Sequence, residues 1–349
     1  MKPITKYLSM AILLPLLFSA CKENPSKENE VIDYNWYFLG FPNTRIWALE
    51  LSDNKLYAGV PNRGLWRLNL NSPEIKWDSL GLTDGTIDDI LIDKGLNTIF
   101  VGVAGGNGQY GIWKTTNEGQ SWIPSSDGIP APSTAIHTFR LAQNPSNPDI
   151  MFANCDWRGL YKSTNRGNSW IEIYSFGTYG ISIEDIEFLN HKGDTIWIGG
   201  INGLGLSVIV ASEDGMNTWY WKSIRGMAHT YIVYDIEADP RNSSIVYVSA
   251  RPYLFKTTNY GESVDTLLTP VYVQDRGYHS SAEISINPNN PQEILCSGAY
   301  IYYSKNGGKN FEKIELPMQN AVSHSLAVDW QRRTLYVAID EFLGSASIS

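Results

Sequence analysis

Apolar and polar residues alternate over short runs along most of this chain, and turn-forming residues interrupt the runs. The clearest unit has runs at residues 231–240, 245–249, 253–257 and 265–268, which are rich in Ile, Val, Tyr and Leu and are separated by Pro, Asn and Gly. Nothing between these runs has the 3.6-residue period of a helix. The pattern therefore predicts four short β-strands in each unit and an all-β fold.

The second run of this unit recurs along the chain, with small residues near most of its ends. The seven copies are Leu56–Val60, Ile99–Val103, Ile150–Asn154, Ile196–Gly200, Ile245–Ser249, Ile294–Gly298 and Leu335–Ile339. Four short strands in a repeat of this length are typical of a β-propeller blade. The sequence therefore predicts a single seven-bladed propeller made of four-stranded blades.

An eight-residue polar motif precedes the fourth run of several units. It reads Thr115–Trp122, Ser163–Trp170, Thr257–Val264 and Ser304–Phe311, and a stretched copy, Ala211–Trp219, carries one extra residue. The motif has Asn at its third position and Gly at its fifth, which favour a tight turn between the third and fourth strands. We therefore expect a structural role for Asn117, Gly119, Trp122, Asn165, Gly167, Trp170, Asn259, Gly261, Asn306 and Gly308.

The segment Trp36–Pro42 has the form of a fourth strand but precedes any first strand. The last unit lacks a fourth strand of its own. We expect the N-terminal strand to complete the last blade, because this pairing removes exposed strand edges and closes the ring. The alternative is a truncated C-terminus in a ring that is stabilised in another way.

The first twenty residues predict a secretory signal, with Lys2 and Lys6 before a short apolar run. The end of this run, before Cys21, resembles the bacterial lipoprotein lipobox, which implies cleavage before Cys21 and its lipidation. The lipid would anchor the protein to a membrane. Residues 21–33 predict a flexible tether, and residues 34–349 the propeller. The charged Lys22 and Glu23 resemble surface-export signals, so the expected location is the outer membrane or cell surface, with the periplasm left open.

Acidic residues outnumber basic ones by 36 to 27, which gives a formal net charge of −9. Such a balance argues against non-specific nucleic-acid binding, which needs clustered Lys and Arg. Beyond the signal only Cys155 and Cys296 remain, in units too far apart for a disulfide, so we expect two buried free thiols. No Cys/His pair has zinc-ligand spacing. We expect a monomer without metal or cofactor.

The turn motif, together with Asn-Pro or Asp-Pro stretches at 144–148, 239–242 and 287–291, resembles the Asp-box, also called the bacterial neuraminidase repeat. The likeness extends to the xyloglucanase, sortilin and photosystem-assembly-factor propellers. It implies the fold, with ligands on the face opposite the turns. Sialidases need an arginine triad, a Tyr/Glu nucleophile pair and six blades, whereas this chain has no Arg-Ile-Pro start and a predicted count of seven blades. It also holds one propeller, whereas xyloglucanases set two around a cleft.

One first-strand position carries acidic residues in four units. The aligned residues are Ala48, Asp89, Thr138, Asp185, Asp235, Glu283 and Ser325. The four carboxylates are candidate catalytic residues at one end of the central channel. They could bind a cation, act as a general acid or contact sugar hydroxyls. The alternative is a polar, water-filled channel without a chemical role.

The loops expected on the same face carry arginine, histidine and aromatic residues. The candidate ligand-binding residues are Arg63, His137, Trp157, Arg158, His229, Arg251, Tyr253, Tyr300 and His324. Arginine pairs with carboxylates and aromatic rings stack on sugars, which is typical of an acidic-glycan platform. The longest loop adds Arg276, Tyr278 and His279, which could perform lyase chemistry on a uronic acid.

These observations favour a membrane-anchored lipoprotein that binds a glycan, such as an acidic polysaccharide, or a protein on the axial face of the propeller. The first alternative is a polysaccharide-cleaving enzyme, either a glycoside hydrolase or a uronate lyase. The second alternative is an assembly factor for a membrane complex.

Overall fold

The computed structural model describes residues 36–105, 110–130, 139–155, 159–175, 181–227, 232–250, 253–268, 283–298, 300–316, 318, 323–339 and 342–348. Residues Val31–Ser349 belong to one compact unit. The elements assigned in the described ranges are all β-strands. None of the described segments is a helix of the length and apolarity needed to cross a membrane.

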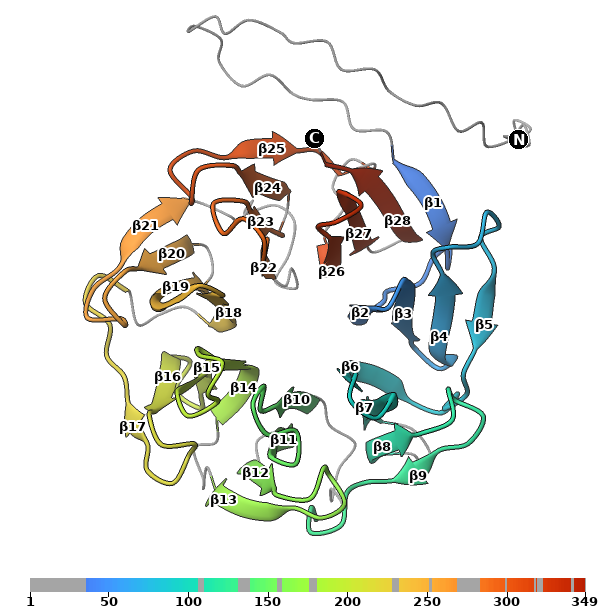
Figure 1. Cartoon of the computed structure of the whole chain (residues 1–349), viewed down its shortest axis with the longest axis horizontal. Helices are drawn as coiled ribbons and strands as arrows, with labels where there is room; N and C mark the ends of the chain where they lie inside the picture. The colour runs from blue at the N-terminus through green and yellow to red at the C-terminus, as the bar shows by residue number, and fades with distance from the viewer. Residues whose placement is uncertain are drawn as a thin grey trace, which may run out of the picture. The chain divides into compact units, whose positions relative to one another are not determined.

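The strands form four-stranded antiparallel sheets arranged around a central axis, as Figure 1 shows. The first three sheets are β2 (Ala48–Ser52), β3 (Lys55–Val60), β4 (Gly64–Asn69) and β5 (Trp77–Ser79); β6 (Thr86–Asp93), β7 (Thr98–Ala104), β8 (Gly111–Thr115) and β9 (Ile123–Pro124); and β10 (Phe139–Gln143), β11 (Met151–Cys155), β12 (Gly159–Ser163) and β13 (Ile171–Ser175).

The next three sheets are β14 (Ile181–Phe188), β15 (Ile196–Asn202), β16 (Ser207–Ser212) and β17 (Tyr220–Trp221); β18 (Val233–Asp239), β19 (Asn242–Ala250), β20 (Tyr253–Thr257) and β21 (Asp265–Leu268); and β22 (Ile284–Ile286), β23 (Ile294–Cys296), β24 (Ile301–Ser304) and β25 (Glu312–Ile314). The remaining sheet joins β26 (Ser323–Asp329), β27 (Thr334–Ile339), β28 (Phe342–Ser347) and β1 (Tyr37–Gly40). The prediction of an all-β propeller with four-stranded blades is confirmed.

The last blade is completed by the N-terminal strand. β1 pairs antiparallel with β28, with Tyr37 opposite Ser345 and Phe38 opposite Gly344. β2 then packs against β26, so that the first blade meets the last. The predicted closure by the segment that begins at Trp36 is therefore confirmed, and it pairs a strand edge that would otherwise be open.

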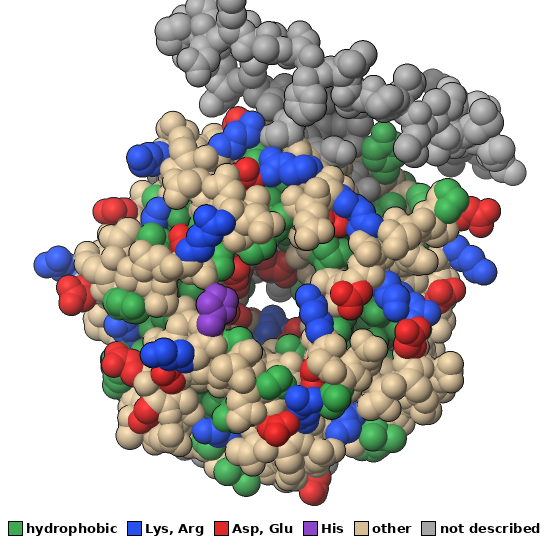
Figure 2. All heavy atoms as spheres, viewed as in Figure 1, with side chains coloured by type: hydrophobic (Ala, Val, Ile, Leu, Met, Phe, Trp, Pro, Cys, Tyr) green, Lys and Arg blue, Asp and Glu red, His purple; other side chains and the backbone are tan. Residues whose placement is uncertain are grey.

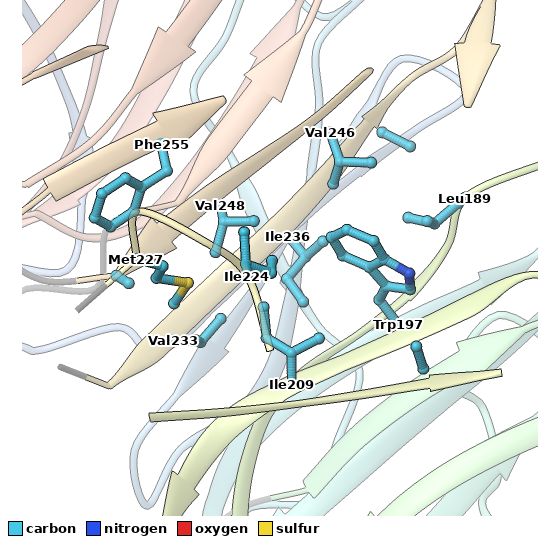
Figure 3. Packing of buried hydrophobic residues seen from close by; sticks show 13 residues of the cluster. Leu189, Trp197, Ile209, Ile224, Met227, Val233, Ile236, Val246, Val248 and Phe255 are labelled. Atoms are coloured by element: carbon cyan, nitrogen blue, oxygen red, sulfur yellow. The ribbon is translucent and has the colours of Figure 1, made fainter. Parts of the chain in front are cut away.

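The hydrophobic core lies between neighbouring blades rather than within one blade. Figure 3 shows one such cluster, in which Trp197 and Ile209 of one blade meet Val233, Ile236 and Val248 of the next. Second strands are almost wholly buried and come close to the following blade. A Cβ on Gly102, for example, would lie 2.1 Å from the Cβ of Phe139. This crowding explains why small residues recur near the ends of these strands.

The two cysteines lie in different blades, as their separation along the chain predicted. Cys155 and Cys296 are both buried, and no disulfide joins them. They lie on the second strands of different blades, β11 and β23. The prediction of two buried apolar thiols without a disulfide is confirmed.

Copies of the turn motif adopt one hydrogen-bonded conformation between third and fourth strands. In the first copy the backbone N–H of Gly119 donates to Oγ1 of Thr115 at 3.0 Å, and the N–H of Ser121 donates to Oδ1 of Asn117 at 3.0 Å. Equivalent bonds recur in the copies that begin at Ser163, Thr257 and Ser304. The Asn oxygen accepts as a carboxylate oxygen would, and its amide group additionally donates to a serine hydroxyl, as from Nδ2 of Asn117 to Oγ of Ser121 at 2.8 Å.

The prediction of a stretched copy at Ala211 was wrong. The motif there is Ser212–Trp219 without an insertion, and Met216 occupies the glycine position with a φ of 65°. Its N–H donates to Oγ of Ser212 at 2.9 Å, as the glycine N–H does in the other copies. The Met216 side chain is buried between two blades, and this packing accompanies a backbone conformation that favours glycine. The neighbouring Gly215 misled the alignment.

The motif and the strand before it also join several neighbouring blades near the rim. The indole N–H of Trp122 donates to the carbonyl of Leu80 at 2.6 Å, and that of Trp170 donates to the carbonyl of Ser125 at 2.7 Å. Just before the motif, Nζ of Lys162 donates to the carbonyl of Gly215 in the following blade at 2.8 Å. We call these bonds rim contacts.

Candidate functional site

The candidate site is a cavity of about 870 Å³ on the ring axis. Its wall contains residues from β2, β6, β10, β14, β18, β22 and β26, which are the innermost strands of the blades. These residues come from the beginnings of the first strands, so the cavity lies at the end of the axis opposite the turn motif. Figure 2 shows a central opening with acidic side chains on its wall.

β-Bulges determine which first-strand side chains reach the cavity. The pairing of β6 with β7 shifts between Ile87 and Asp89, and that of β14 with β15 shifts between Ile183 and Asp185. The same shift occurs in β18 and β26. Because a bulge inserts one residue and re-aims the side chains beside it, two consecutive residues line the cavity in each strand. These pairs are Asp88 with Asp89, Glu184 with Asp185, Tyr234 with Asp235, and His324 with Ser325.

The four predicted carboxylates each accept a hydrogen bond from the backbone of the next blade. The N–H of Leu141 donates to Oδ2 of Asp89 at 2.6 Å, and that of Ile236 donates to Oδ2 of Asp185 at 2.9 Å. Asp235 accepts from the N–H of Ile284, and Glu283 accepts from that of Leu326. Ser325 continues the series, since its Oγ accepts from the N–H of Leu49 at 3.1 Å. We call these five bonds axial clasps.

Burial raises the pKa of the carboxyls that form axial clasps. The pKa of Asp185 is raised to about 6 and that of Glu283 to about 7, while the pKa values of Asp89 and Asp235 are also raised. Desolvation is the largest cause in each case, because it penalises the charged form. The backbone N–H donated to each carboxyl opposes the rise.

One cation lies among these carboxyls. Arg140 of β10 donates from Nε to the carbonyl of Glu184 at 2.6 Å, and its Nη2 lies 3.8 Å from Oε2 of the same residue. Its Nη1 donates to the carbonyl of Phe139 at 2.9 Å. These bonds fix the guanidinium in the wall between β10 and β14, where it offsets part of the negative charge.

Besides Glu184, two further carboxyls of the wall are less fully paired than those of the axial clasps. Glu50 of β2 is half-buried and makes no hydrogen bond or ion pair with the described part of the chain, and burial raises its pKa to about 8. The carboxyl of Asp88 accepts the backbone N–H of Phe139 in the next blade, but its Oδ2 is buried without a hydrogen-bond partner among the described residues. Burial raises the pKa of Asp88 to about 7, although Arg140 opposes the shift.

The candidate residues of the loops are distributed unevenly. His324 lines the cavity, is 2% exposed and packs its ring edge-on against Trp47, with 5.1 Å between ring centroids. Arg63, Tyr253 and Tyr300 are not among the cavity-lining residues. Tyr300 instead lies beneath the ammonium group of Lys313, at 3.3 Å from the ring centroid.

Several predicted residues lie outside the described part of the chain. They are Cys21, His137, Trp157, Arg158, His229, Arg251, Arg276, Tyr278 and His279. The structure therefore bears neither on lipidation nor on the proposed lyase trio.

Sequence alignment found the four carboxylates that form axial clasps but missed four other charged residues of the wall. Glu50 and Arg140 lie two positions beyond the aligned residues Ala48 and Thr138, so the two-residue period of a strand could have identified them. Asp88 and Glu184 directly precede aligned carboxylates. They reach the cavity because of the bulges, which the sequence pattern did not reveal.

A smaller cavity of about 410 Å³ lies at the opposite end of the first strands. Glu187 and Glu237 line it, and burial raises both pKa values, that of Glu187 to about 8. Glu187 accepts the N–H of Ala238 at 3.3 Å, which repeats the axial clasp two residues further along the strand. The described side chains offer no group of three or more His, Cys, Asp or Glu arranged to hold a metal ion.

The wall can act chemically in two ways. A protonated carboxyl such as Glu50 can donate a hydrogen bond to a carbonyl or hydroxyl, and the ionised form can bind an ammonium or guanidinium group. Acid–base catalysis needs a free acid and a free base placed beside one scissile bond. The clasp carboxyls already hold neighbouring blades together.

Comparisons with known proteins identify the fold. No protein-family model matches the chain, and no curated protein sequence matches it either. Among solved structures, the GH74 xyloglucanase from Xanthomonas campestris aligns with a TM-score of 0.68 and 15% identity, over 89% of this chain and 53% of that enzyme. The chain thus spans about half the length of this enzyme.

YCF48 from Cyanidioschyzon merolae aligns with a TM-score of 0.61 and 11% identity, over 89% of this chain and 98% of that one. A structure described as YCF48 bound to D1 peptide aligns with a TM-score of 0.63 and 12% identity, over 92% of this chain and all of that one. Identities this low show a shared β-propeller fold and nothing about activity.

Proposed function

We propose that this chain is a binding propeller that captures a partner in its axial cavity. The observation that carries the proposal is the cavity of about 870 Å³, to which the innermost strand of every blade contributes. Ligand sites are commonly concave, with a few polar groups that converge on one point. Because most of its carboxyls are engaged in axial clasps, the wall is better suited to binding than to catalysis.

A protein segment fits this cavity better than an acidic polysaccharide. The wall carries seven carboxyls and one arginine among its described residues, so a polyanion would find few cationic partners there and would be repelled by those carboxyls that are ionised. Arg63, which was expected to pair with such a glycan, is not part of the cavity. YCF48, whose described complex contains a peptide, aligns over its whole length, which supports a protein-binding role, including that of an assembly factor.

A glycan-cleaving activity is the alternative, favoured by the raised pKa values of the axial carboxyls and by the fold of the GH74 xyloglucanase. The chain corresponds to about half of that enzyme. Incubation with neutral and uronate-containing polysaccharides, followed by mass spectrometry of the products, distinguishes the outcomes. Shortened chains would establish a hydrolase and unsaturated ends a lyase, and either result would contradict a purely binding role.

We further propose that the protein is held at the outer membrane or cell surface by a lipid on Cys21. The support is the sequence around this residue. Intact mass spectrometry of the mature protein should find an acylated N-terminal cysteine. The Cys21→Ala variant should be lost from the membrane fraction, and protection from protease added to whole cells would indicate a periplasmic rather than a surface location.

Site-specific photo-crosslinking tests the position of the binding site. A benzophenone amino acid replaces Trp47, which lines the cavity and is 38% exposed, in cells that express the protein. The matched control carries the same group at Trp221, which is 51% exposed on the outer strand β17. A discrete adduct at position 47 but not at 221 is expected. Equal labelling at both positions, or labelling at 221 alone, would exclude the axial cavity as the binding site.

A further inference from the structure

The charged side chains of the axial cavity are strongly unbalanced. Its wall contains the carboxyls of Glu50, Asp88, Asp89, Glu184, Asp185, Asp235 and Glu283. Arg140 supplies the one basic charge among the described lining residues apart from His324. A cavity lined by one sign of charge and surrounded by a low-dielectric fold concentrates the opposite charge. This imbalance favours a cationic group in the ligand.

Most of these carboxyls already have a partner within the fold. Asp89, Asp185, Asp235 and Glu283 accept backbone N–H groups in the axial clasps. Glu184 lies beside the guanidinium of Arg140 and accepts a hydrogen bond from the Ser182 hydroxyl at 2.9 Å. Their hydrogen-bonding capacity is therefore partly used before any ligand arrives.

Glu50 and Asp88 are different. The half-buried carboxyl of Glu50 has no hydrogen bond or ion pair to the described residues. The carboxyl of Asp88 accepts the backbone N–H of Phe139, but its Oδ2 is buried without a hydrogen-bond partner among the described residues. An unpaired buried acceptor costs roughly 1–3 kcal/mol. The two residues lie on β2 and β6, which pack against each other in neighbouring blades. This sector of the wall therefore leaves one buried acceptor, Oδ2 of Asp88, without a donor among the described residues, beside the unpaired carboxyl of Glu50.

We propose that Glu50 and Asp88 bind a cationic group of the ligand, namely the ammonium of a lysine or the guanidinium of an arginine in a partner protein. This inference rests on the proposed function and gives the chemistry of the ligand. Trp47, just before β2, also lines the cavity and offers apolar surface to the aliphatic part of such a side chain. Charge-assisted hydrogen bonds of this kind are about twice as strong as neutral ones.

Proton release should accompany binding. Burial raises the pKa of Glu50 to about 8, with Asp89 adding to the rise and Lys94 opposing it. The pKa of Asp88 is raised to about 7, with Asp89 and Glu184 adding to the rise and Arg140 opposing it. A bound cation favours the ionised carboxylates, so it lowers both pKa values. Affinity for a cation should therefore increase as the pH rises from 6 to 9.

Calorimetric titration with acetylated, amidated hexalysine tests the inference on the full chain. Hexaglutamate and a neutral Gly/Ser hexapeptide serve as peptide controls, and spermidine tests whether a free polyamine suffices. The Glu50→Gln and Asp88→Asn variants each remove one negative charge and retain a similar shape. The matched control is Glu74→Gln, because Glu74 is exposed and lies outside the cavity.

The expected result is one hexalysine site, with affinity at least 10-fold weaker in each of the two cavity variants and within 2-fold of wild type in Glu74→Gln. Heats measured in buffers of different ionisation enthalpy should reveal proton release near pH 7.5. Spermidine binding as tight as that of hexalysine would support the cation site and identify a small polyamine as its source. Circular dichroism melts check that the variants are folded.

Two results would overturn the inference. One is hexalysine binding that Glu50→Gln, Asp88→Asn and Glu74→Gln weaken equally, which would mean attraction to the general negative charge of the protein. The other is an absence of hexalysine binding although position 47 still cross-links to a partner. The second result would leave the axial binding site intact and remove only its cationic ligand, so the two proposals can fail separately.

Discussion

Neighbouring blades are joined near the axis and again at the rim, by contacts of different chemistry. At the axis, an acidic side chain such as Asp185 accepts the backbone N–H of the next blade. At the rim, a neutral indole N–H such as that of Trp170 donates to a backbone carbonyl. The axial clasps therefore contain titratable groups, whereas the tryptophan rim contacts do not.

The difference also separates structure from candidate function. The rim contacts belong to a local motif that recurs with the same hydrogen bonds, and these bonds engage its polar groups. The axial position has diverged from blade to blade, since Ala48 and Ser325 replace carboxylates found elsewhere. In the sector of Ala48, the acidic side chain of Glu50 reaches the same cavity without a hydrogen bond to the described residues, and that of Asp88 reaches it with its Oδ2 unpaired. Equivalent strands of a repeated fold thus carry both carboxyls that bond the next blade and a carboxyl without such a bond.

The largest expected effect is a loss of stability as the pH rises, which follows from the axial region alone. Burial raises the pKa of Asp185 to about 6, of Glu283 and Asp88 to about 7, and of Glu50 to about 8. Ordinary values are about 4, so folding is favoured by protonation of these groups. Their contribution is complete below about pH 4 and is lost as the pH rises through 6 to 8.

Thermal melts between pH 5 and 9 measure this effect. One pKa unit corresponds to about 1.4 kcal/mol, and because several carboxyls titrate, their combined effect should exceed that of any single substitution described below. The melting temperature should fall steadily across this range. A melting temperature that rises toward pH 9 would contradict the account of the axial carboxyls as buried groups that hold protons.

The next largest effect is expected at the rim, from Trp170→Ala. Trp170 is 3% exposed, packs between two blades and donates its indole N–H to Ser125. Removing a buried aromatic side chain costs roughly 3–5 kcal/mol. Chemical denaturation should show this loss, with little change in its dependence on pH. Trp221→Ala is the matched control, because Trp221 is 51% exposed and should cost less than about 1 kcal/mol.

The fold could be predicted from the sequence because its signals are local. Strand alternation, the second-strand copies and the turn motif each occupy fewer than about ten residues, and the early strand beginning at Trp36 revealed how the last blade is completed. The motif copy with Met216 was misaligned because a non-glycine residue there adopts a positive φ. Only its tertiary packing against the neighbouring blade indicates why this is tolerated.

The candidate site could be predicted only in part. The aligned position correctly brought Asp89, Asp185, Asp235 and Glu283 into one cavity. Their bonds to the next blade depend on how two blades pack, which no local pattern encodes. Asp88 and Glu184 reach the cavity through bulges that shift the strand register. A bulge moves a side chain to the other face, so a strict two-residue period assigns such residues wrongly.

The smallest expected effect on stability comes from substitutions in one axial clasp. Two variants distinguish the contribution of its hydrogen bond from that of the carboxyl charge. Asp235→Leu removes the acceptor for the N–H of Ile284, and a buried donor left without a partner costs roughly 1–3 kcal/mol. Asp235→Asn keeps an acceptor oxygen but cannot ionise, so it should be nearly neutral at pH 6. Because burial raises the pKa of Asp235 well above its ordinary value, wild type loses stability relative to the Asn variant as the pH rises, so the Asn variant should be favoured more at pH 9 than at pH 6. Denaturation at both pH values measures the difference, and equal losses for Leu and Asn would show that the hydrogen bond does not contribute to joining these blades.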